Sequence, residues 1–392
     1  MNEITFSIFQ HNPAASAVMA QLLKQFESEE KIRVRLDVIP WPNGWQRLME
    51  MGLYRIGADI SEIGSTWVMD FVRMDAIRPY SDGEVEAITG GRRYFEASWE
   101  GGREKGNQGR SVWAIPMAGD TRAIFYRRDW LTKAGVDEET AFKGPSRFDH
   151  TLSLILKAGC SMPLSLPTGH ARNNIHGLAS WIWSLGGDFL SADGTRIELG
   201  NQRALEGFKA YFALGRFLGT QSTAEATDSE LAFKDGRSAM TISGPWILHE
   251  QRAEEVASNL GIAPVPGTPF VGGEHLVIWK HSRHPEEALC LARFLAQPEI
   301  SSKMYPLFGL PVTEAAWTNP QFQETGFEVF QNAMKTGRCF PTSPLWGLVE
   351  KRLSDALPGI WAEVLTHPDR VDSIVENNVT TLAKRLQMTL QG

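Results

Sequence analysis

The chain has 392 residues, of which 39 are basic and 46 acidic, so its formal net charge is −7. This length predicts two or three domains, and 42% hydrophobic with 22% charged residues is the composition of a folded globular protein. The acidic balance argues against a nucleic-acid-binding protein, and no apolar run approaches the roughly 18 residues that span a bilayer.

The chain has three cysteines, Cys160, Cys290 and Cys339. An odd number without CxxC spacing gives neither a disulfide framework nor a zinc ligand set. His281 and His284 are spaced like a weak metal pair, but no further ligand follows them. We therefore expect no metal and no cofactor.

The first 70 residues alternate strand and helix patterns. Strands are predicted at Ile4–Phe9, at Ile32–Val38, whose alternating charges suit a sheet edge, and at Ala58–Ile63. The first helix has Asn12 as its N-cap with Pro13 behind it, and a short helix covers Trp45–Tyr54. This alternation predicts an α/β protein with parallel sheets flanked by helices.

Later segments continue the same pattern. The further strands predicted are Val112–Ile115, Ala123–Tyr126, Ser238–Ser243 and His275–Trp279. The further helices predicted are Ala204–Leu218 with Asn201 as its cap, Pro285–Ala296, and the chain from Gly347 onward with one break at Pro358-Gly359.

Tryptophan is frequent, with 13 residues, and several follow predicted strands. Trp41 and Trp45 follow the second strand, Trp67 the third, and Trp246 the Ser238 strand. Ligands bind at the carboxyl ends of strands in open parallel sheets, so these positions are candidates for a binding site. Four other tryptophans lie inside element patterns and are expected in the core: Trp130, Trp279, Trp317 and Trp361.

Indole rings beside amide and carboxylate groups suit a sugar, because a pyranose packs its C–H face on the ring while its hydroxyls need polar partners. The alternative for any single tryptophan is core packing, which is the commoner role. The few basic residues in these loops favour a neutral sugar, and an oligosaccharide over a single ring.

Known catalytic motifs are absent from the sequence, including GxSxG, HExxH, GxxxxGK[ST] and GxGxxG. A pair of carboxylates for glycoside hydrolysis need not be close in sequence, and Asp120, Asp188 and Glu274 are the candidates. A hydrogen-bonding or capping role is the commoner one for each. A binding protein is therefore the leading interpretation, with a polysaccharide-active enzyme as an alternative.

The order of several segments resembles family 1 of the extracellular solute-binding proteins of ABC importers, the group of maltose-binding and other sugar-binding proteins. The similar segments are VWAIP (112–116), GDTRAIFY (119–126), AFKDGRSAMTISGPWIL (232–248), GIAPVPG (261–267), GGEHLVI (272–278) and the segment 284–312. The resemblance implies a two-lobed, type II-like periplasmic-binding-protein fold with solute held between the lobes. The chain would cross about three times, giving one lobe of 1–117 plus 266–312 and another of 118–265 plus 313–392.

The resemblance also implies which residues bind solute. Trp246 matches the aromatic residue of the family's Gly-Pro-Trp motif and is the firmest single candidate. The ligand-binding residues expected from the strand-end rule and the resemblance together are Asn12, Trp41, Trp45, Thr66, Trp67, Asp120, His176, Trp181, Trp246, Gly273, Glu274 and His275.

The function implied is capture of a carbohydrate by lobe closure and delivery to the membrane permease of an ABC importer, by a monomer. Another solute, such as a polyamine or a glycerophosphodiester, is the alternative among binding proteins; Arg122 or Arg172 could bind a phosphate. The family location is periplasmic or at the cell surface. The first residues lack the charged and apolar regions of a signal peptide, so a cytoplasmic sugar sensor stays an alternative.

Overall fold

The computed structural model describes residues 2–11, 13–104, 111–169, 173–219, 225–249, 252–304, 307–323, 326–343 and 345–391. The chain divides into two compact units. Unit 1 comprises Met1–Asp120, Val271–Glu324 and Cys339–Gly347, and unit 2 comprises Thr121–Phe270, Thr325–Arg338 and Leu348–Gly392.

These boundaries differ from the expected lobes mainly at two segments. Residues 313–324 and 339–347 were expected in the second lobe but belong to unit 1. Trp317 ties the first segment to unit 1, because its ring contacts Phe95 and its Nε1 donates to the carbonyl oxygen of Pro311 at 2.9 Å. The second segment lines a hollow together with Thr66.

Unit 1 is built on one sheet. Its strands are β1 (Glu3–Phe9), β2 (Arg33–Ile39), β3 (Ile60–Gly64), β4 (Ile115–Thr121) and β8 (Val271–Ile278). Its helices are α1 (Pro13–Glu30), α2 (Trp41–Tyr54), α3 (Val68–Arg73), α4 (Asp82–Thr89), α5 (Glu96–Glu100), α12 (Pro285–Leu295) and α13 (Pro298–Met304).

The strand order is β2-β1-β3-β8-β4, so β2 lies at an edge of the sheet as its charges predicted. β1 pairs in parallel with both β2 and β3, whereas β8 runs antiparallel to β3. The carboxyl ends of β1, β2 and β3 therefore meet at one edge of the sheet.

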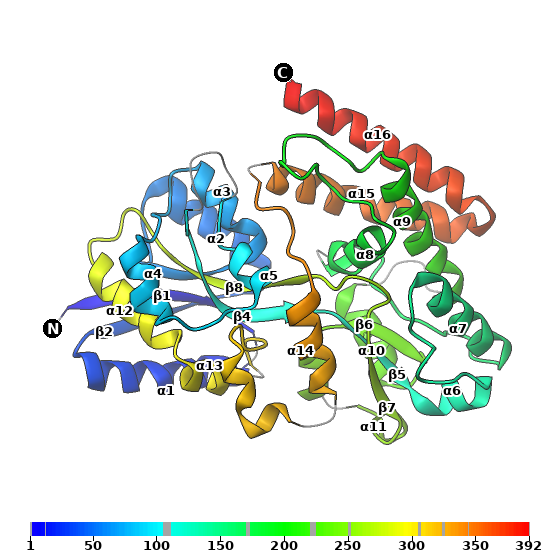
Figure 1. Ribbon diagram of the computed structural model, residues 1–392, viewed down its shortest axis with the longest axis horizontal. Helices are drawn as coiled ribbons and strands as arrows, with labels where there is room; N and C mark the ends of the chain where they lie inside the picture. The colour runs from blue at the N-terminus through cyan, green and yellow to red at the C-terminus, as the bar shows by residue number, and fades with distance from the viewer. Residues whose placement is uncertain are drawn as a thin grey trace. The chain divides into compact units, whose positions relative to one another are not determined.

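Helices cover both faces of this sheet (Figure 1). Each face of the sheet has its own hydrophobic core, and alternate side chains of β8 belong to different cores. Leu276 and Ile278 face α1, α12 and α13, whereas Val277 faces α2 and α3. The burial pattern of β1, with six consecutive buried residues, is what a strand covered on both faces requires.

Unit 2 has a smaller sheet and more helices. Its strands are β5 (Ala123–Arg127), β6 (Met240–Ser243) and β7 (Leu260–Pro264). Its helices are α6 (Arg128–Ala134), α7 (Pro145–Lys157), α8 (Asn173–Ser184), α9 (Gln202–Phe212), α10 (Ala226–Lys234), α11 (Glu254–Ala257), α14 (Phe327–Thr336), α15 (Trp346–Thr366, whose first two residues belong to unit 1) and α16 (Val371–Gln391).

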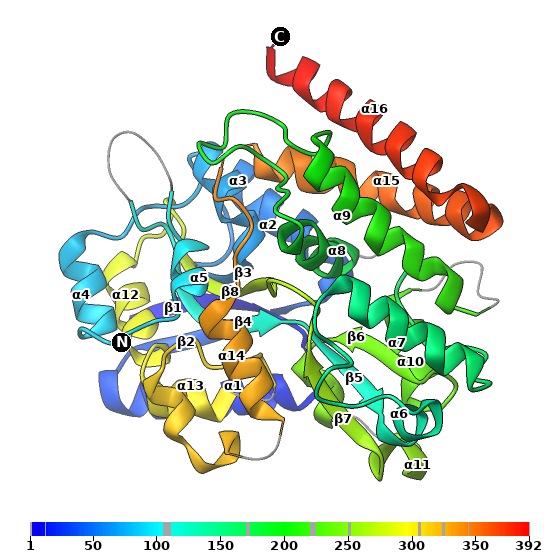
Figure 2. The same ribbon diagram turned by 45° about the vertical axis from the view of Figure 1, so that its right-hand side comes forward.

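The strand order in unit 2 is β6-β5-β7, and β5 runs antiparallel to both neighbours. The expectation of a mainly parallel sheet is therefore wrong for these three strands. Helices α8 and α9 pack together, and α16 lies along α9, as Figure 2 shows. The α/β class of both units agrees with the sequence.

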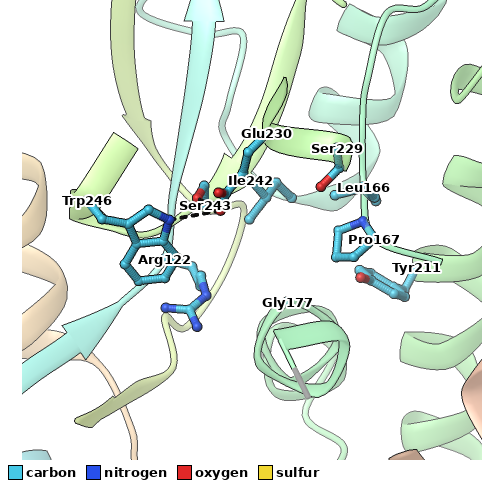
Figure 3. Close-up of a pocket in the computed structure, with 10 residues that line it drawn as sticks. All are labelled: Arg122, Leu166, Pro167, Gly177, Tyr211, Ser229, Glu230, Ile242, Ser243 and Trp246. Atoms are coloured by element: carbon cyan, nitrogen blue, oxygen red, sulfur yellow. Dashed lines mark hydrogen bonds between the residues drawn. The ribbon is translucent and has the colours of Figure 1, made fainter. Parts of the chain in front are cut away.

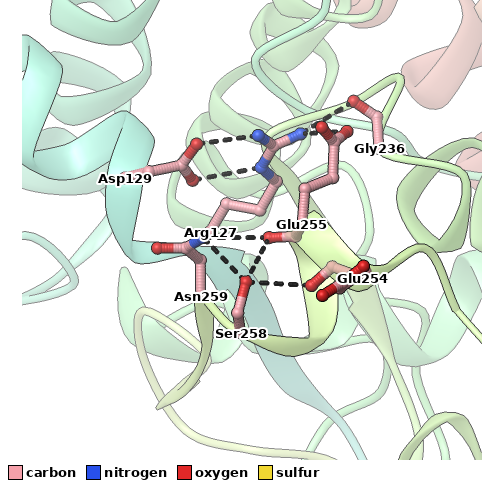
Figure 4. Close-up of polar contacts among 7 residues, drawn as sticks. All are labelled: Arg127, Asp129, Gly236, Glu254, Glu255, Ser258 and Asn259. Atoms are coloured by element: carbon pink, nitrogen blue, oxygen red, sulfur yellow. Dashed lines mark hydrogen bonds and ion pairs between the residues drawn. The ribbon is translucent and has the colours of Figure 1, made fainter.

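An arginine fastens the end of β5 to the loops beside it. Arg127 is buried, and its guanidinium makes two hydrogen bonds to the Asp129 carboxylate, at 2.7 and 3.1 Å, and one to Glu255 at 3.1 Å (Figure 4). It also donates to the carbonyl oxygen of Gly236 at 3.0 Å. A buried guanidinium with this many acceptors carries no uncompensated charge. Its contacts join the end of β5 to Gly236 and to α11.

Several predicted elements have different bounds in the structure. The strand predicted at Val112–Ile115 begins only at Ile115, and the predicted break at Pro358 is absent because α15 continues through it to Thr366. Proline removes one helical hydrogen bond, but burial of the neighbouring Leu357, Ile360 and Trp361 offsets that loss.

Three of the four tryptophans expected in the core are buried, namely Trp279, Trp317 and Trp361. Trp279 also donates from Nε1 to the hydroxyl oxygen of Ser61 at 2.6 Å. Trp130 is the exception, because it is half-buried in α6 with the Lys133 ammonium 4.4 Å from its ring centroid.

Candidate functional site

An aromatic cluster of Phe9, Trp41, Trp45 and Trp67 lies where β1, β2 and β3 end in unit 1. Trp41 stacks on Phe9 with ring centroids 4.2 Å apart, and Trp67 meets Trp45 edge-on at 5.4 Å. Trp41 is 39% exposed and Trp45 half-buried, whereas Trp67 is buried. The parallel pairing thus gathers the predicted tryptophans, and Trp41 presents the largest open ring.

The loop predicted around Trp41 is the start of a helix. α2 begins at Trp41 with Pro42 in its first turn, where proline is favoured because no hydrogen-bond donor is needed. A Cβ at Gly44 would come within 2.6 Å of the Phe9 ring. Glycine there lets the helix lie directly on Phe9 and fixes the position of Trp41.

A buried carboxylate beneath this cluster was not predicted. Glu62 of β3 is almost fully buried and accepts hydrogen bonds from the Phe9 backbone N–H at 2.9 Å and from His11 at 2.6 Å. The His11 ring also contacts Trp41, edge-on at 5.5 Å. This pair orders the loop after β1. Asn12, predicted as the N-cap of the first helix and as a ligand-binding residue, lies outside the described residues.

Thr66 lines a hollow of about 260 Å³ in unit 1. The other wall comes from the segment 339–346, which the sequence did not assign to a site. Phe340 and Trp346 stack there with centroids 4.3 Å apart. The lining residues are Ser65, Thr66, Met69, Gly101, Cys339, Phe340, Pro341, Thr342 and Trp346.

The predicted ligand-binding residues on β4 and β8 are less exposed to solvent than Trp41. Gly273 has φ of 126°, and a Cβ there would lie 2.1 Å from the Ala118 carbonyl oxygen, so glycine is required for the backbone to approach so closely. Glu274 and Asp120 are half-buried. His275 is fully buried beside the carbonyl oxygen of Ser98 at 2.9 Å, and burial lowers its pKa to about 4. A neutral, enclosed imidazole fits a structural role for His275.

Trp246 stands at the rim of a hollow in unit 2. It lies directly after β6, in the short helix Pro245–His249, and is half-buried. A Cβ at Gly244 would lie 2.0 Å from Cζ3 of the Trp246 ring. The Gly-Pro-Trp sequence therefore lets the indole fold back over the end of its own strand.

A carboxylate from a neighbouring helix holds this indole. Nε1 of Trp246 donates to Oε1 of Glu230 in α10 at 2.9 Å, and the Ser243 hydroxyl donates to the same oxygen at 2.5 Å (Figure 3). Glu230 was not predicted from the sequence. The bond from Nε1 orients the ring, and the bond from Ser243 fixes the carboxylate that accepts it.

Arg122 lies on the other side of Trp246, with its Cζ 5.0 Å from the ring centroid. It is buried, and its Nη2 lies 2.7 Å from Nδ1 of His176 in α8. Arginine has no acceptor, so this nitrogen of His176 accepts the hydrogen bond. The His176 ring also stacks on Phe270 at 4.1 Å. His176 therefore lies beside Arg122 and Phe270, and its role in ligand binding stays a prediction.

Arg122, Glu230 and Trp246 line a hollow in unit 2 that contains about 360 Å³ of empty space, open solvent included. In Figure 3, Trp246 and Arg122 form one side of it, and Pro167 and Tyr211 the other. The lining residues are Arg122, Leu166, Pro167, Gly177, Tyr211, Ser229, Glu230, Ile242, Ser243 and Trp246. We call this space the unit 2 hollow.

Trp181 does not reach it. Its ring is 1% exposed and contacts Phe148 and Tyr211 edge-on at 6.1 and 5.4 Å. Gly177, one turn earlier on the same side of α8, lines the hollow, whereas the Trp181 ring is covered by Phe148 and Tyr211. The prediction that Trp181 contacts a ligand does not fit this burial.

One of the candidate catalytic carboxylates, Asp188, is engaged within unit 2. Asp188 accepts from Nε1 of Trp183 at 3.2 Å and pairs with Arg338 at 2.6 Å, a hydrogen-bonding role. Among the described residues, no three His, Cys, Asp or Glu side chains are grouped as a metal site. In the same residues, no helix is both long and apolar enough to cross a membrane.

Comparison with known proteins defines the class. Residues 11–301 match the family model of the bacterial extracellular solute-binding proteins, so the chain belongs to that family. A binding protein of Brucella abortus is 24% identical over 371 residues, covering 92% of this chain and 88% of that protein. The diacetylchitobiose-binding protein of Streptomyces coelicolor is 23% identical over 353 residues, covering 84% of this chain and 78% of that protein.

Solved structures with a similar fold are also known. The GacH receptor of Streptomyces glaucescens, solved without ligand and with acarbose, superposes with a TM-score of 0.81 over 99% of both chains at 20% identity. The fold of this chain is therefore the two-lobed fold of the ABC-importer solute-binding proteins, which the segment order in the sequence had implied.

Proposed function

We propose that this chain is the solute-binding component of an ABC importer and that it captures a neutral oligosaccharide. Family membership supports the binding role, and the observation that carries the choice of solute is Trp246, an indole fixed by Glu230 at the rim of the unit 2 hollow. A ring held in one orientation can stack on a pyranose without losing rotamer freedom. Trp41, the most exposed tryptophan of the aromatic cluster, is the second stacking surface.

The charges of the hollow favour a neutral solute. Arg122 and Glu230 both line it, one cationic and one anionic. A glycerophosphodiester would suit Arg122 but would bring its negative charge toward the Glu230 carboxylate, and a polyamine would meet the opposite conflict. Sugar hydroxyls donate and accept, so they can satisfy both groups.

We further propose that the solute closes the two lobes and is handed to the membrane permease, and that the protein works as a monomer in the periplasm or at the cell surface. We propose that nine of the expected residues bind the ligand: Trp41, Trp45, Thr66, Trp67, Asp120, His176, Trp246, Gly273 and Glu274. Binding without turnover distinguishes this role from that of a polysaccharide-active enzyme, which chromogenic glycosides would reveal.

A thermal-shift screen tests the choice of solute. The panel contains neutral di- and trisaccharides, diacetylchitobiose and maltotriose among them, together with phosphorylated and cationic solutes. A solute present at 100 times its Kd stabilises the folded protein by roughly 2.7 kcal/mol. We expect at least one neutral oligosaccharide to raise the melting temperature; shifts from phosphorylated or cationic solutes alone would contradict the proposal.

Small-angle X-ray scattering tests lobe closure. The radius of gyration should fall when the saccharide that raises the melting temperature is added at saturation, because contacts that both lobes make are completed only in the closed state. An unchanged radius of gyration at saturation would contradict closure while leaving the choice of solute standing.

A further inference from the structure

Two polar groups of the unit 2 hollow have no hydrogen-bond partner among the residues that the structure describes. One is the phenol hydroxyl of Tyr211, and the other is the second carboxylate oxygen of Glu230. They lie on different walls of the hollow, Tyr211 in α9 and Glu230 in α10 (Figure 3).

Tyr211 is 1% exposed, yet its hydroxyl makes no hydrogen bond with any of the residues that the structure describes. Burial alone raises the pKa of Tyr211, with no hydrogen bond contributing. A phenylalanine would fill the same space, so the hydroxyl that faces the hollow is available to a ligand.

Glu230 divides its two oxygens between different tasks. Oε1 accepts from both Trp246 and Ser243, which fixes the carboxylate plane. Oε2 accepts no hydrogen bond from the described part of the chain. A fixed carboxylate with one open oxygen binds a hydroxyl donor strongly, because the hydrogen bond is charge-assisted.

Gly177 keeps the space beside the Tyr211 hydroxyl open. A Cβ at this position of α8 would lie 3.2 Å from the hydroxyl oxygen, so any side chain would crowd it. Glycine inside a helix lowers stability relative to alanine. Access to Tyr211 offers a reason for glycine here.

We propose that the unit 2 hollow is a specificity pocket for one hydroxylated end of the captured sugar, in which Glu230 Oε2 accepts one sugar hydroxyl and the Tyr211 hydroxyl binds another. This inference rests on the proposed function and deepens it. The pocket selects a sugar end that carries free hydroxyls and rejects one that carries a carboxylate or phosphate, since Glu230 would repel it.

Tyr211→Phe is the sharpest test, because it removes one oxygen and keeps the shape. Without sugar, the melting temperature of the variant should be unchanged or higher, since no protein hydrogen bond is lost. The Kd for each neutral saccharide that shifts the wild-type melting curve should rise about tenfold in isothermal titration. The matched control is Tyr80→Phe in unit 1, whose hydroxyl donates to the Leu276 carbonyl oxygen at 3.2 Å; it should lose stability and keep its Kd.

Glu230→Gln is the second test. Its amide oxygen can still hold Trp246, whereas the charge is gone, so the Kd should rise tenfold or more while the variant stays folded. Normal Kd values in both Tyr211→Phe and Glu230→Gln would overturn the specificity pocket and leave the proposed function intact. If the wild type binds no neutral saccharide at all, the proposed function fails, and the pocket fails with it.

Discussion

Nε1 of Trp246 donates a 2.9 Å hydrogen bond to Oε1 of Glu230, across 16 positions of the sequence. The bond joins the short helix after β6 to α10 and sets the plane of the indole. Since Glu230 also binds Ser243, the rim of the unit 2 hollow is held by three residues from three elements, namely α10, β6 and the short helix after β6.

Trp246→Ala should weaken sugar binding by about 2 kcal/mol or more, as central aromatic anchors do. The ring is half-buried, so the melting temperature without sugar should change little. Isothermal titration and a thermal melt measure the two effects. Trp361→Ala is the comparison, because that ring is fully buried and its loss should cost about 3–5 kcal/mol of stability. A Trp246→Ala protein with normal affinity would remove Trp246 from the site.

Gly244→Ala should also lower the affinity, through the position of the indole. The new methyl group would collide with the Trp246 ring, which must then move from its bond to Glu230. Intrinsic tryptophan fluorescence should shift in the variant without sugar. Gly83→Ala in α4 is the control, since nothing lies within 4 Å of the added Cβ, and it should stabilise the helix by up to about 1 kcal/mol. Equal affinities for wild type and Gly244→Ala would argue against a fixed indole.

Trp41 and Trp181 should respond in opposite ways. Trp41→Ala should reduce affinity with little loss of stability, because 39% of the residue is exposed. Trp181→Ala should lower the free energy of unfolding by about 3–5 kcal/mol, because its ring fills the core of unit 2. Urea denaturation measures stability and titration measures affinity. A loss of stability in Trp41→Ala together with a loss of affinity in Trp181→Ala would contradict these two roles.

How far the sequence predicts this site depends on which contacts are local. The tryptophans after β2 and β3 could be placed together because both strands run parallel to β1 between them, so their carboxyl ends meet at one edge. Trp181 could not be separated from His176, since both lie on one helix and only packing against Tyr211 decides which faces inward.

Glu230 and Tyr211 were missed because their roles depend on tertiary contacts. Each left a signal in the helical periodicity. Glu230 lies three residues before buried Phe233, and Tyr211 three after buried Phe208, so both polar tips share a face with the core. The antiparallel pairing of β5 left no such signal, because strands as short as four residues do not reveal their partner's direction.

Stability should depend on pH through His275. Its folded pKa of about 4 lies below the ordinary value of 6.5, because burial disfavours the charged ring. The folded protein then binds fewer protons than the unfolded chain, so its free energy of unfolding falls as the pH drops from about 6.5 to about 4, by about 3 kcal/mol at most.

Urea denaturation at pH 4, 5, 6 and 7 measures this dependence, with His275→Gln as the comparison. The variant should be less stable at pH 7 and should lose less stability on acidification than the wild type. Parallel pH profiles for the two proteins would show that His275 does not contribute to the acid sensitivity.

The most direct test of the account is a crystal structure with the neutral saccharide that raises the melting temperature most. We predict a sugar ring packed against Trp246 with one hydroxyl within hydrogen-bond distance of Glu230 Oε2. A saccharide bound away from both Trp246 and Trp41 would contradict the central claim.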